Sequence, residues 1–331
     1  MQLYLDSFGA YLSVREGMFQ VRVPDQEARR FAVRQVGAIL LTKGTAMSTD
    51  ALLLAAEHDI PVLFIDAQTH YPLAQVHSAR PGNIAAVRRA QAEAARSAGG
   101  FQWVAAVMAD KIARQKALLL RLSDTEGDTL RMMTSIETTL RHWQPPAGEW
   151  QHSAAAERLR GQEGTASRLY FQALGQWLQQ RGVVFTNRQQ RPAYEPFNAL
   201  LNYLYGILYT QVQLALLKSG LDPTMGILHA DQYGGRPTLA YDLIEPYRPW
   251  ADEVALLHIV PKEGFATGAY FQPDADGAGW WLSAEGKSEA VEKMLLFLAE
   301  KSTFEGRMLR KSVQIDLAAQ KLVGFLQEIR Q

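Results

Sequence analysis

The sequence of 331 residues contains no cysteine. This absence excludes disulfide bonds, iron–sulfur clusters held by cysteine, thiolate zinc sites and cysteine nucleophiles. A chain without cysteine is compatible with a reducing compartment, and we therefore expect a cytoplasmic protein. Apolar residues make up 47% of the chain and charged residues 21%, which is ordinary for a globular protein.

The sequence also has no excess of charge of either sign, because 34 lysine and arginine residues balance 34 aspartate and glutamate residues. A strongly basic total is the simplest sign of nucleic-acid binding, and this sign is missing. Residues 81–250 nevertheless carry 18 basic and 14 acidic side chains, whereas residues 251–331 carry 9 and 12. This small excess in the middle of the chain is compatible with a nucleic-acid surface but does not establish one.

The sequence has no segment typical of a signal peptide or of a membrane span. The first ten residues carry Asp6 and lack a cationic start followed by an apolar stretch. The longest apolar stretch, Ala199–Leu217, is interrupted by Asn202, Gln211 and Gln213. This pattern favours a buried helix over a membrane-spanning one, so no membrane interaction is expected.

The first 80 residues are typical of β-structure, since short runs of β-branched and aromatic residues alternate with turn-forming residues. One helix is expected there, at Ser48–His58, with Leu52, Leu53 and Ala56 facing inward. The predicted strands are Gln2–Leu5, Tyr11–Arg15, Met18–Val23, Arg30–Arg34, Ala38–Leu41, Pro61–Asp66 and Tyr71–His77.

After residue 82 the pattern becomes helical, with apolar residues at helical spacing, and we place a domain boundary there. The sequence thus predicts an α+β protein. A β-rich N-terminal domain, residues 1–82, is followed by a larger all-α domain, residues 83–331. The predicted helices cover residues 84–98, 101–122, 129–142, 153–181, 196–220, 240–247, 285–301 and 312–330.

The longest helical patterns also predict where individual side chains lie. The helix at 101–122 is expected to carry Lys111 and Gln115 on its polar side. Tyr203, Tyr205 and Tyr209 recur along the helix at 196–220. Such an aromatic stripe belongs to a core more often than to a platform for stacking nucleic-acid bases.

The stretch Gly226–Glu245 carries the clearest chemical signal, because it places one imidazole and two carboxylates around a turn rich in glycine. Asp242 and Glu245 are three residues apart and share a face if they are helical. The turn can fold His229 back toward them. Nitrogen and carboxylate ligands together suit a divalent metal such as Mg²⁺ or Mn²⁺. A helix cap, a salt bridge and a solvated face are the more common explanation of such a pattern.

A second signal lies at Glu163, which falls within a predicted helix and is flanked by Gly161 and Gly164. Glycine is unfavourable inside a helix because of the backbone entropy it loses. The two glycines therefore indicate the close approach of another backbone or of a ligand. Alternatively, Glu163 is a surface acid and the glycines mark a break in the helix.

Taken together, motifs along the chain resemble those of the CRISPR-associated integrase family, the metal-dependent subunit of the spacer-acquisition complex. Glu163–Phe171 resembles Glu-Gly-x-x-x-Arg-x-Tyr-Phe, and Asn187–Leu201 resembles a proline- and asparagine-containing motif. The glycine-rich stretch resembles Gly-x-Leu-His followed by Asp-Leu-Ile-Glu and by Arg-Pro, here at Arg248. The likeness covers nearly the whole chain. Two positions depart from it: Gly235 looks like an added residue, and Glu195 replaces an expected aspartate.

The resemblance implies a catalytic site. Glu163, His229 and Glu245 are the implied ligands of Mg²⁺ or Mn²⁺. Asp242 is implied as a fourth catalytic residue, either a further ligand or a residue that holds the site in place. The helical domain is the implied catalytic domain.

The resemblance also implies a reaction and an assembly. The implied activity is that of a metal-dependent DNA endonuclease and integrase. It inserts short prespacer DNA into the CRISPR array when a 3′-hydroxyl attacks a repeat phosphodiester. The implied assembly is a homodimer formed through the β-rich domain, with a small ferredoxin-like partner subunit.

Arginine side chains are the expected contacts to the phosphates of double-stranded DNA, since guanidinium groups pair well with phosphate. For any single arginine, a solvated surface position explains its presence equally well. The candidates are Arg168, Arg181, Arg188, Arg191 and Arg236.

Two other functions use the same residues. In a non-specific metal-dependent DNA nuclease, the ligands activate water instead of a sugar hydroxyl. In a non-catalytic DNA-binding scaffold, the carboxylates are structural. Joined strands, shortened strands and metal-independent binding distinguish the three alternatives.

Overall fold

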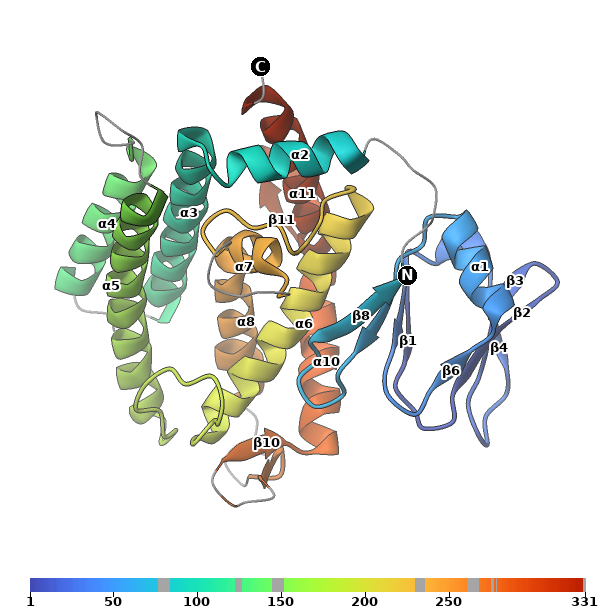
Figure 1. Ribbon diagram of the computed structural model, residues 1–331. Coiled ribbons are helices and arrows are strands. Elements are labelled where there is room, and N and C mark those ends of the chain that lie inside the picture. Colours follow the sequence, from blue (N-terminus) through green and yellow to red (C-terminus); the bar gives the residue numbers. More distant parts are fainter. Residues whose placement is uncertain are drawn as a thin grey trace.

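The computed structural model describes residues 1–76, 84–122, 127–144, 152–229, 236–260, 268–274, 277 and 279–329. Figure 1 shows the strands of the N-terminal region on one side of the molecule and long helices on the other. This arrangement confirms the predicted α+β class. The predicted boundary near residue 82 lies outside the described residues.

The N-terminal region forms two four-stranded sheets. In the first sheet, β1, β5 and β7 run parallel, and β8 pairs antiparallel with β7. All four residues of the interior strand β5 are buried, as expected for a strand covered on both faces. The first sheet has the order β1 (Gln2–Leu5), β5 (Ala38–Leu41), β7 (Val62–Ile65), β8 (Pro72–Val76), and the second the order β4 (Arg29–Phe31), β3 (Met18–Arg22), β2 (Tyr11–Arg15), β6 (Ala46–Met47).

Helix α1 (Thr49–Glu57) packs against β2. It is buried through Ala51 and Ala55, whereas Leu53 is 61% exposed. The predicted inward face was therefore wrong for Leu53, and Leu52 is only half-buried. Alanines one turn apart let the helix lie close to the sheet, which larger side chains on that face would prevent.

The helical part is built from nine helices in the described residues, with the predicted eight among them. Helices α3, α4 and α5 pack side by side, and α6 packs against α7, α8, α10 and α11 (Figure 1). The bounds are α2 (Ile84–Ala94), α3 (Ala98–Leu122), α4 (Gly127–Arg141), α5 (His152–Gln179), α6 (Pro196–Lys218), α7 (Thr238–Ile244), α8 (Arg248–Val254), α10 (Ala284–Ala299) and α11 (Lys311–Ile329).

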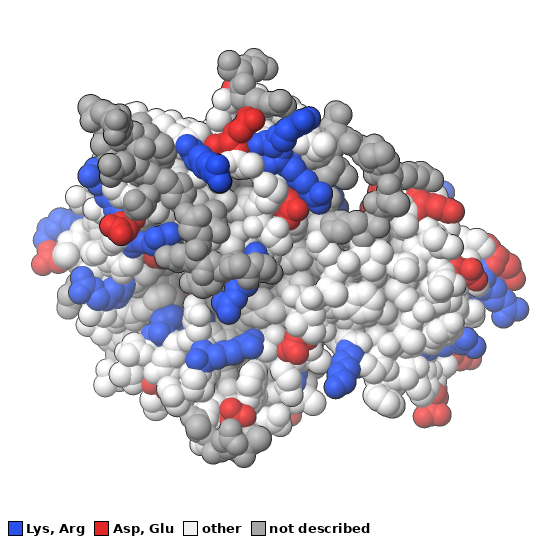
Figure 2. Space-filling model, in the orientation of Figure 1, with Lys and Arg blue, Asp and Glu red and all other residues white. Residues whose placement is uncertain are grey.

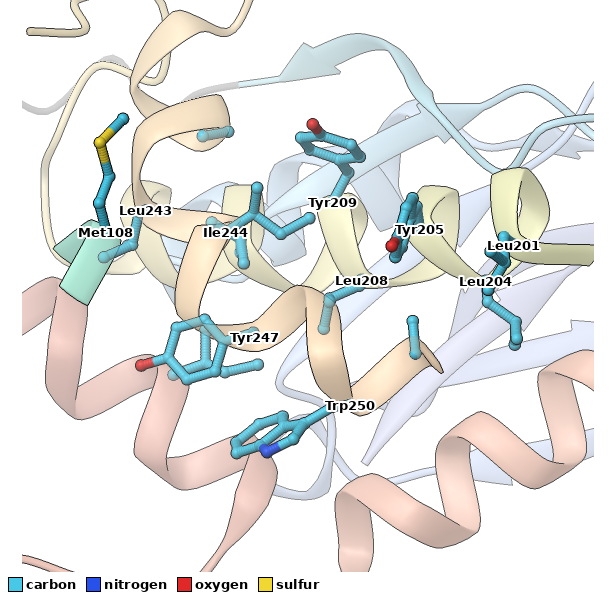
Figure 3. Packing of buried hydrophobic residues seen from close by; sticks show 14 of the residues in the cluster. Met108, Leu201, Leu204, Tyr205, Leu208, Tyr209, Leu243, Ile244, Tyr247 and Trp250 are labelled. Atoms are coloured by element: carbon cyan, nitrogen blue, oxygen red, sulfur yellow. The ribbon is translucent and has the colours of Figure 1, made fainter. Parts of the chain in front are cut away.

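Helix α6 is the central helix of the fold. It is long and apolar enough to cross a membrane by length and composition, but 89% of its most apolar window is buried inside the protein. Figure 3 shows Tyr205 and Tyr209 of this helix in one apolar cluster with Tyr247 and Trp250 of the α7–α8 region. The predictions of a buried helix and of a structural aromatic stripe are both confirmed.

The C-terminal domain predicted as all-α also contains two small antiparallel hairpins, so that part of the prediction was wrong. They are β9 (Phe271–Pro273) with β10 (Trp280–Leu282), and β11 (Lys301–Phe304) with β12 (Arg307–Arg310). In the second hairpin, Glu305 and Gly306 both have positive φ angles, 50° and 77°. Two such residues form the tight turn that suits the twist of a hairpin, so a sequence signal was present in Glu-Gly.

The N-terminal sheet is anchored on α6 through the loop that follows β7. Thr210 Oγ1 donates a hydrogen bond to the carbonyl oxygen of His70 at 2.7 Å. Gly206 allows this approach, because a Cβ at its position would lie 1.8 Å from the carbonyl oxygen of Thr69. The loop and the helix are therefore packed backbone to backbone.

Two of the polar residues that interrupt the apolar run of α6, Gln211 and Gln213, face the N-terminal strands. The amide groups of Gln2 and Gln211 hydrogen-bond each other at 2.7 and 3.2 Å, and Gln213 Nε2 donates to Gln75 Oε1 at 3.1 Å. Buried amides need such partners. These glutamines thus join the two parts of the molecule and fix the β-rich region against the helical one.

Candidate active site

A cavity of about 520 Å³ lies in the helical part, and all three predicted ligands line it. Glu163 comes from α5, His229 from the segment after α6, and Glu245 from the turn after α7. The fold therefore brings together residues that are 82 positions apart in the sequence. The ionisable side chains around the cavity are Lys111, Arg160, Glu163, Arg168, Arg188, His229, Glu245 and Arg248.

Helix α7 and the chain after it place two of the acidic side chains. The 3₁₀ turn Glu245–Tyr247 continues α7, and α8 follows directly. Pro246 and Pro249 fit in the first turns of these elements, where a missing N–H costs nothing. Asp242 and Glu245 are both buried and lie on one continuous helical path, as their spacing predicted.

Asp242 is the hydrogen-bond acceptor that fixes His229. Its Oδ1 lies 2.6 Å from Nδ1 of His229, and its Oδ2 accepts from the backbone N–H groups of Ile227 and Leu228 at 2.6 and 3.2 Å. A carboxylate acceptor at Nδ1 keeps the proton there and leaves the lone pair on Nε2. Both oxygens of Asp242 are thus engaged within the chain, so its place is behind His229.

The approach of these two segments depends on Gly226. A Cβ at this position would lie 2.7 Å from the backbone carbon of Thr238, and the N–H of Gly226 donates to Oγ1 of Thr238 at 3.0 Å. The glycine lets the chain before His229 pack against the start of α7. The added residue Gly235 falls outside the described residues.

Glu163 projects from α5 and is held by two neighbours. Its Oε1 accepts a hydrogen bond from Ser167 Oγ at 2.7 Å and another from Lys111 Nζ. A Cβ added at Gly161 or Gly164 would meet nothing within 4 Å. Close approach of another described backbone to these glycines is therefore wrong, and so is a helix break, because α5 runs without interruption from His152 to Gln179. The approach of a ligand stays a prediction.

Lys111, predicted on the polar side of α3, is buried at the cavity. Its side chain is 7% exposed, and Nζ contacts Glu163 Oε1 and lies 2.7 Å from Glu245 Oε2. Gln115, one turn later, is buried as well. The predicted polar side of α3 faces the cavity instead of solvent, so a single ammonium lies between two of the predicted ligands.

Arg248 is a further charged residue of the cavity that had entered only as part of a motif. Its Nε donates to Glu245 Oε1 at 2.9 Å, and its NH2 group donates to the hydroxyl of Tyr209 at 2.6 Å. The guanidinium also lies over the ring of Tyr205, 5.1 Å from its centre. These contacts hold Arg248 and Glu245 in a fixed relation.

The charges of the cavity keep its carboxylates ionised. Burial by itself raises the pKa of Glu245, but Arg248 and Lys111 outweigh it and lower the pKa to about 2. For Glu163, burial raises the pKa and Lys111 more than offsets this, so the net pKa is lowered. Burial lowers the pKa of Lys111, but Glu245 and Glu163 raise it above its ordinary value. Two anions and an ammonium are therefore present together at neutral pH.

The chemical types of the three side chains suit a divalent cation, although the side chains stand too far apart to coordinate one. Among the described residues, no three histidine or acidic side chains lie close enough together to hold an ion as they stand. Glu245 Oε2 is buried, and Nζ of Lys111, 2.7 Å away, is its one ion-pair partner among the described residues. Two carboxylates and an imidazole nitrogen around one cavity are ligands that Mg²⁺ or Mn²⁺ accepts.

The predicted DNA-contacting arginines are distributed over two adjoining cavities. Arg168 and Arg188 line the first, and Arg191 and Arg236 line a second of about 580 Å³ that shares Arg188, His229 and Arg248 with it. Arg181 lines neither; it stacks on Trp177 with its guanidinium 3.8 Å from the ring centre. Four of the five candidate arginines thus line one of the two cavities that His229 also lines.

The loop that carries Arg188 is shaped by Asn198 and Glu195. Arg188 donates to the side-chain oxygens of Asn198 and Asn202 at 3.1 and 2.6 Å. Asn198 Nδ2 donates to Glu195 Oε2 at 3.0 Å, and Glu195 Oε1 accepts from the N–H of Thr186 at 2.9 Å. Glu195 therefore performs an identifiable structural task in the position where an aspartate was expected.

Basic side chains on the face shown in Figure 2 lie across the helical part, with acidic ones between them. This mixed distribution agrees with the neutral total of the sequence. On this face the positive charge is therefore not uniform, and the two cavities gather several arginines locally.

Comparison with known proteins gives one consistent result. The family model described as "CRISPR associated protein Cas1" matches residues 3–295. A relative from Thermus thermophilus named CRISPR-associated endonuclease Cas1 1 is 32% identical and covers 100% of this chain and 93% of its own.

Solved structures share the fold. A Cas6-RT-Cas1–Cas2 complex has a TM-score of 0.77 at 23% identity, covering 99% of this chain and 35% of that chain. A casposase bound to integration product has a TM-score of 0.64 at 19% identity, covering 99% and 96%. At these identities the likeness establishes the architecture.

Proposed function

Because the chain belongs to the Cas1 family of CRISPR-associated proteins, we propose that its cavity is the active site of a metal-dependent DNA endonuclease and integrase of CRISPR adaptation. The single observation that supports this most is that Glu163, His229 and Glu245 line one cavity together with four arginines. The reaction is insertion of short prespacer DNA into the CRISPR array. A 3′-hydroxyl attacks a phosphodiester of the repeat.

Glu163, Glu245 and Nε2 of His229 are the residues that would hold Mg²⁺ or Mn²⁺. When bound, such an ion neutralises phosphate charge and favours deprotonation of the attacking hydroxyl. Asp242 keeps the proton of His229 on Nδ1, so that Nε2 presents its lone pair to the cavity. Asp242 is therefore a positioning residue in this proposal.

The arginines bind and orient the DNA backbone. Arg168 and Arg188 lie in the cavity itself, and Arg191 and Arg236 extend the positive surface into the neighbouring one. Guanidinium groups can hold phosphate oxygens in pairs, which aligns the phosphodiester for attack. Arg248 is already bonded to Glu245 and Tyr209, so its main task is to fix that carboxylate.

The assembly proposed for the chain follows its family. One structural neighbour is described as a Cas1–Cas2 complex and another as bound to an integration product. We infer that this chain binds double-stranded DNA, both prespacer and repeat, and works with a small ferredoxin-like adaptation subunit. A homodimer formed through residues 1–82 and a cytoplasmic location complete the proposal.

A strand-transfer assay tests the function. A labelled prespacer duplex with 3′-hydroxyl ends is incubated with repeat DNA, the partner subunit and Mg²⁺ or Mn²⁺. The joined product is expected with wild type and absent with Glu163→Gln or His229→Ala. A duplex ending in 3′-deoxynucleotides is the matched control, because it cannot attack but can still be hydrolysed.

Each outcome of this assay points to one of the alternative functions. Shortened strands without joined ones would identify a nuclease that activates water. Joining that continues with the 3′-deoxy substrate, or with both variants, would contradict the proposed site. DNA binding that is independent of metal and is not followed by any strand change would favour a scaffold.

A further inference from the structure

The ammonium group of Lys111 occupies the space between two of the three proposed metal ligands. Nζ contacts Glu163 Oε1 and lies 2.7 Å from Glu245 Oε2. The side chain is 7% exposed, and it reaches this point from α3, a different helix from either carboxylate. Its position is therefore set by the packing of α3 against α5 and against the turn after α7.

The charge balance at this point is already complete without a metal ion. Glu163 and Glu245 contribute two negative charges, and Lys111 together with Arg248 contributes two positive ones. A divalent cation entering between the carboxylates would bring two further positive charges next to a buried ammonium. At such distances and in a partly dry cavity, repulsion between like charges is large.

We propose that Lys111 is an internal counter-ion of Glu163 and Glu245, and that its ammonium and the catalytic metal ion exclude each other. Metal loading then requires Nζ of Lys111 to leave both carboxylates. The cavity of about 520 Å³ that Lys111 lines provides room for this movement. The inference rests on the proposed metal-dependent function and adds a residue that sets the affinity for the metal.

Two observations favour exchange over simultaneous binding. Glu245 Oε2 is buried, and its one ion-pair partner among the described residues is Lys111, whose Nζ lies 2.7 Å away. Its other oxygen, Oε1, keeps the bond from Arg248 and fixes the carboxylate when Oε2 changes partner. A ligand oxygen that can change its partner without moving its carboxylate is suited to such an exchange.

Calorimetric titration of the full-length protein with Mn²⁺ alone tests the inference. The variant Lys111→Met keeps an unbranched side chain, one atom shorter, and removes its charge. We expect Mn²⁺ to bind this variant about tenfold more tightly or better, because the competing charge is gone. The matched control is Lys116→Met, since Lys116 lies on the same helix but pairs with Glu137 outside the cavity; its affinity should stay at the wild-type value.

A second measurement uses the wild-type protein and does not depend on the folding of a variant. The amines are acylated with and without Mn²⁺ and quantified by mass spectrometry. Labelling of Lys111 should rise several-fold when Mn²⁺ binds, and labelling of Lys116 should not change. Unchanged labelling of Lys111 at saturating Mn²⁺ would overturn the inference.

The outcomes distinguish this inference from the function on which it rests. If wild type binds Mn²⁺ in a way that Glu163→Gln abolishes, but Lys111→Met binds equally tightly or more weakly, only the role of Lys111 is wrong. If neither wild type nor Lys111→Met binds Mn²⁺, the proposed metal site fails and the inference fails with it.

Discussion

Nδ1 of His229 lies 2.6 Å from Oδ1 of Asp242, and the second oxygen of Asp242 accepts two backbone hydrogen bonds from the residues just before His229. One buried carboxylate thus fixes both the ring and the backbone that carries it. Nitrogen ligands of metals are commonly oriented by such a partner. The arrangement makes Asp242 the residue on which the geometry of His229 depends.

Replacing Asp242 by asparagine should lower strand-transfer activity and Mn²⁺ affinity by about 10- to 100-fold. The amide can donate to Nδ1, which would place the proton on Nε2, the nitrogen proposed to hold the metal ion. The neutral amide should also accept the backbone hydrogen bonds of Ile227 and Leu228 less strongly. This should lower the free energy of unfolding by about 1–3 kcal/mol. Activity, calorimetry and urea denaturation measure the three effects.

Asp222→Asn is the control for this change. Asp222 also accepts a hydrogen bond from a backbone N–H, that of Thr224 at 3.0 Å, but it does not line the cavity. This variant should be slightly less stable and fully active. Equal losses of activity in both variants would show that Asp242 acts through general stability alone.

Two glycines of long helices should respond oppositely to alanine. A Cβ at Gly206 would overlap the carbonyl oxygen of Thr69, whereas a Cβ at Gly161 meets nothing within 4 Å. Gly206→Ala should therefore lower the free energy of unfolding by about 2 kcal/mol or more, since backbone must move. Gly161→Ala should raise it by about 0.5–1 kcal/mol, because alanine is the better helix former. Urea denaturation of the two variants, compared with wild type, measures both changes.

The ordered motifs were sufficient to predict which residues meet in the cavity. Glu163, His229 and Glu245 come from three elements, and composition or periodicity alone could not have joined them. The sequence left open whether Asp242 is a metal ligand or a positioning residue, because either kind of carboxylate can stand three residues before Glu245. Only the two backbone N–H groups directed at Oδ2 distinguish the second role from the first.

Lys111 illustrates what the sequence could not provide. In an amphipathic helix, a lysine that faces solvent and one that faces a buried acidic cluster have the same pattern. The difference arises only when Glu163 and Glu245 arrive from other elements and cover the ammonium. The inward face of α1 was missed for a related reason, since the sheet selects small alanines where hydrophobicity favoured leucines.

The stability of the protein should fall in mild acid because of His70. The ring is buried between Tyr4 and Tyr203, and burial lowers its pKa from 6.5 to about 4. Since the folded state holds the proton less tightly than the unfolded chain, stability is complete above pH 6.5 and is lost as the pH falls toward 4. The loss should reach about 2 kcal/mol by pH 5.

Urea denaturation at pH 7 and pH 5 measures this loss. In His70→Gln, the difference in unfolding free energy between pH 7 and pH 5 should be smaller than in wild type by the amount that His70 contributes. His142→Gln, a change at an exposed position, should leave the difference as in wild type. An unaltered pH dependence in His70→Gln would assign the acid sensitivity to other groups.

Removal of single arginines should separate DNA contacts from structural charges. Arg168 lines the cavity that holds Glu163 and Glu245, whereas Arg181, two residues after the end of α5, stacks on Trp177. Arg168→Gln should weaken DNA binding and reduce the slope of log affinity against log salt by about 1, the effect of losing one phosphate contact. Arg181→Gln should leave affinity and slope unchanged. Fluorescence anisotropy over a range of salt concentrations measures both quantities, and a reduced slope in Arg181→Gln with an unchanged slope in Arg168→Gln would place the DNA along a different path.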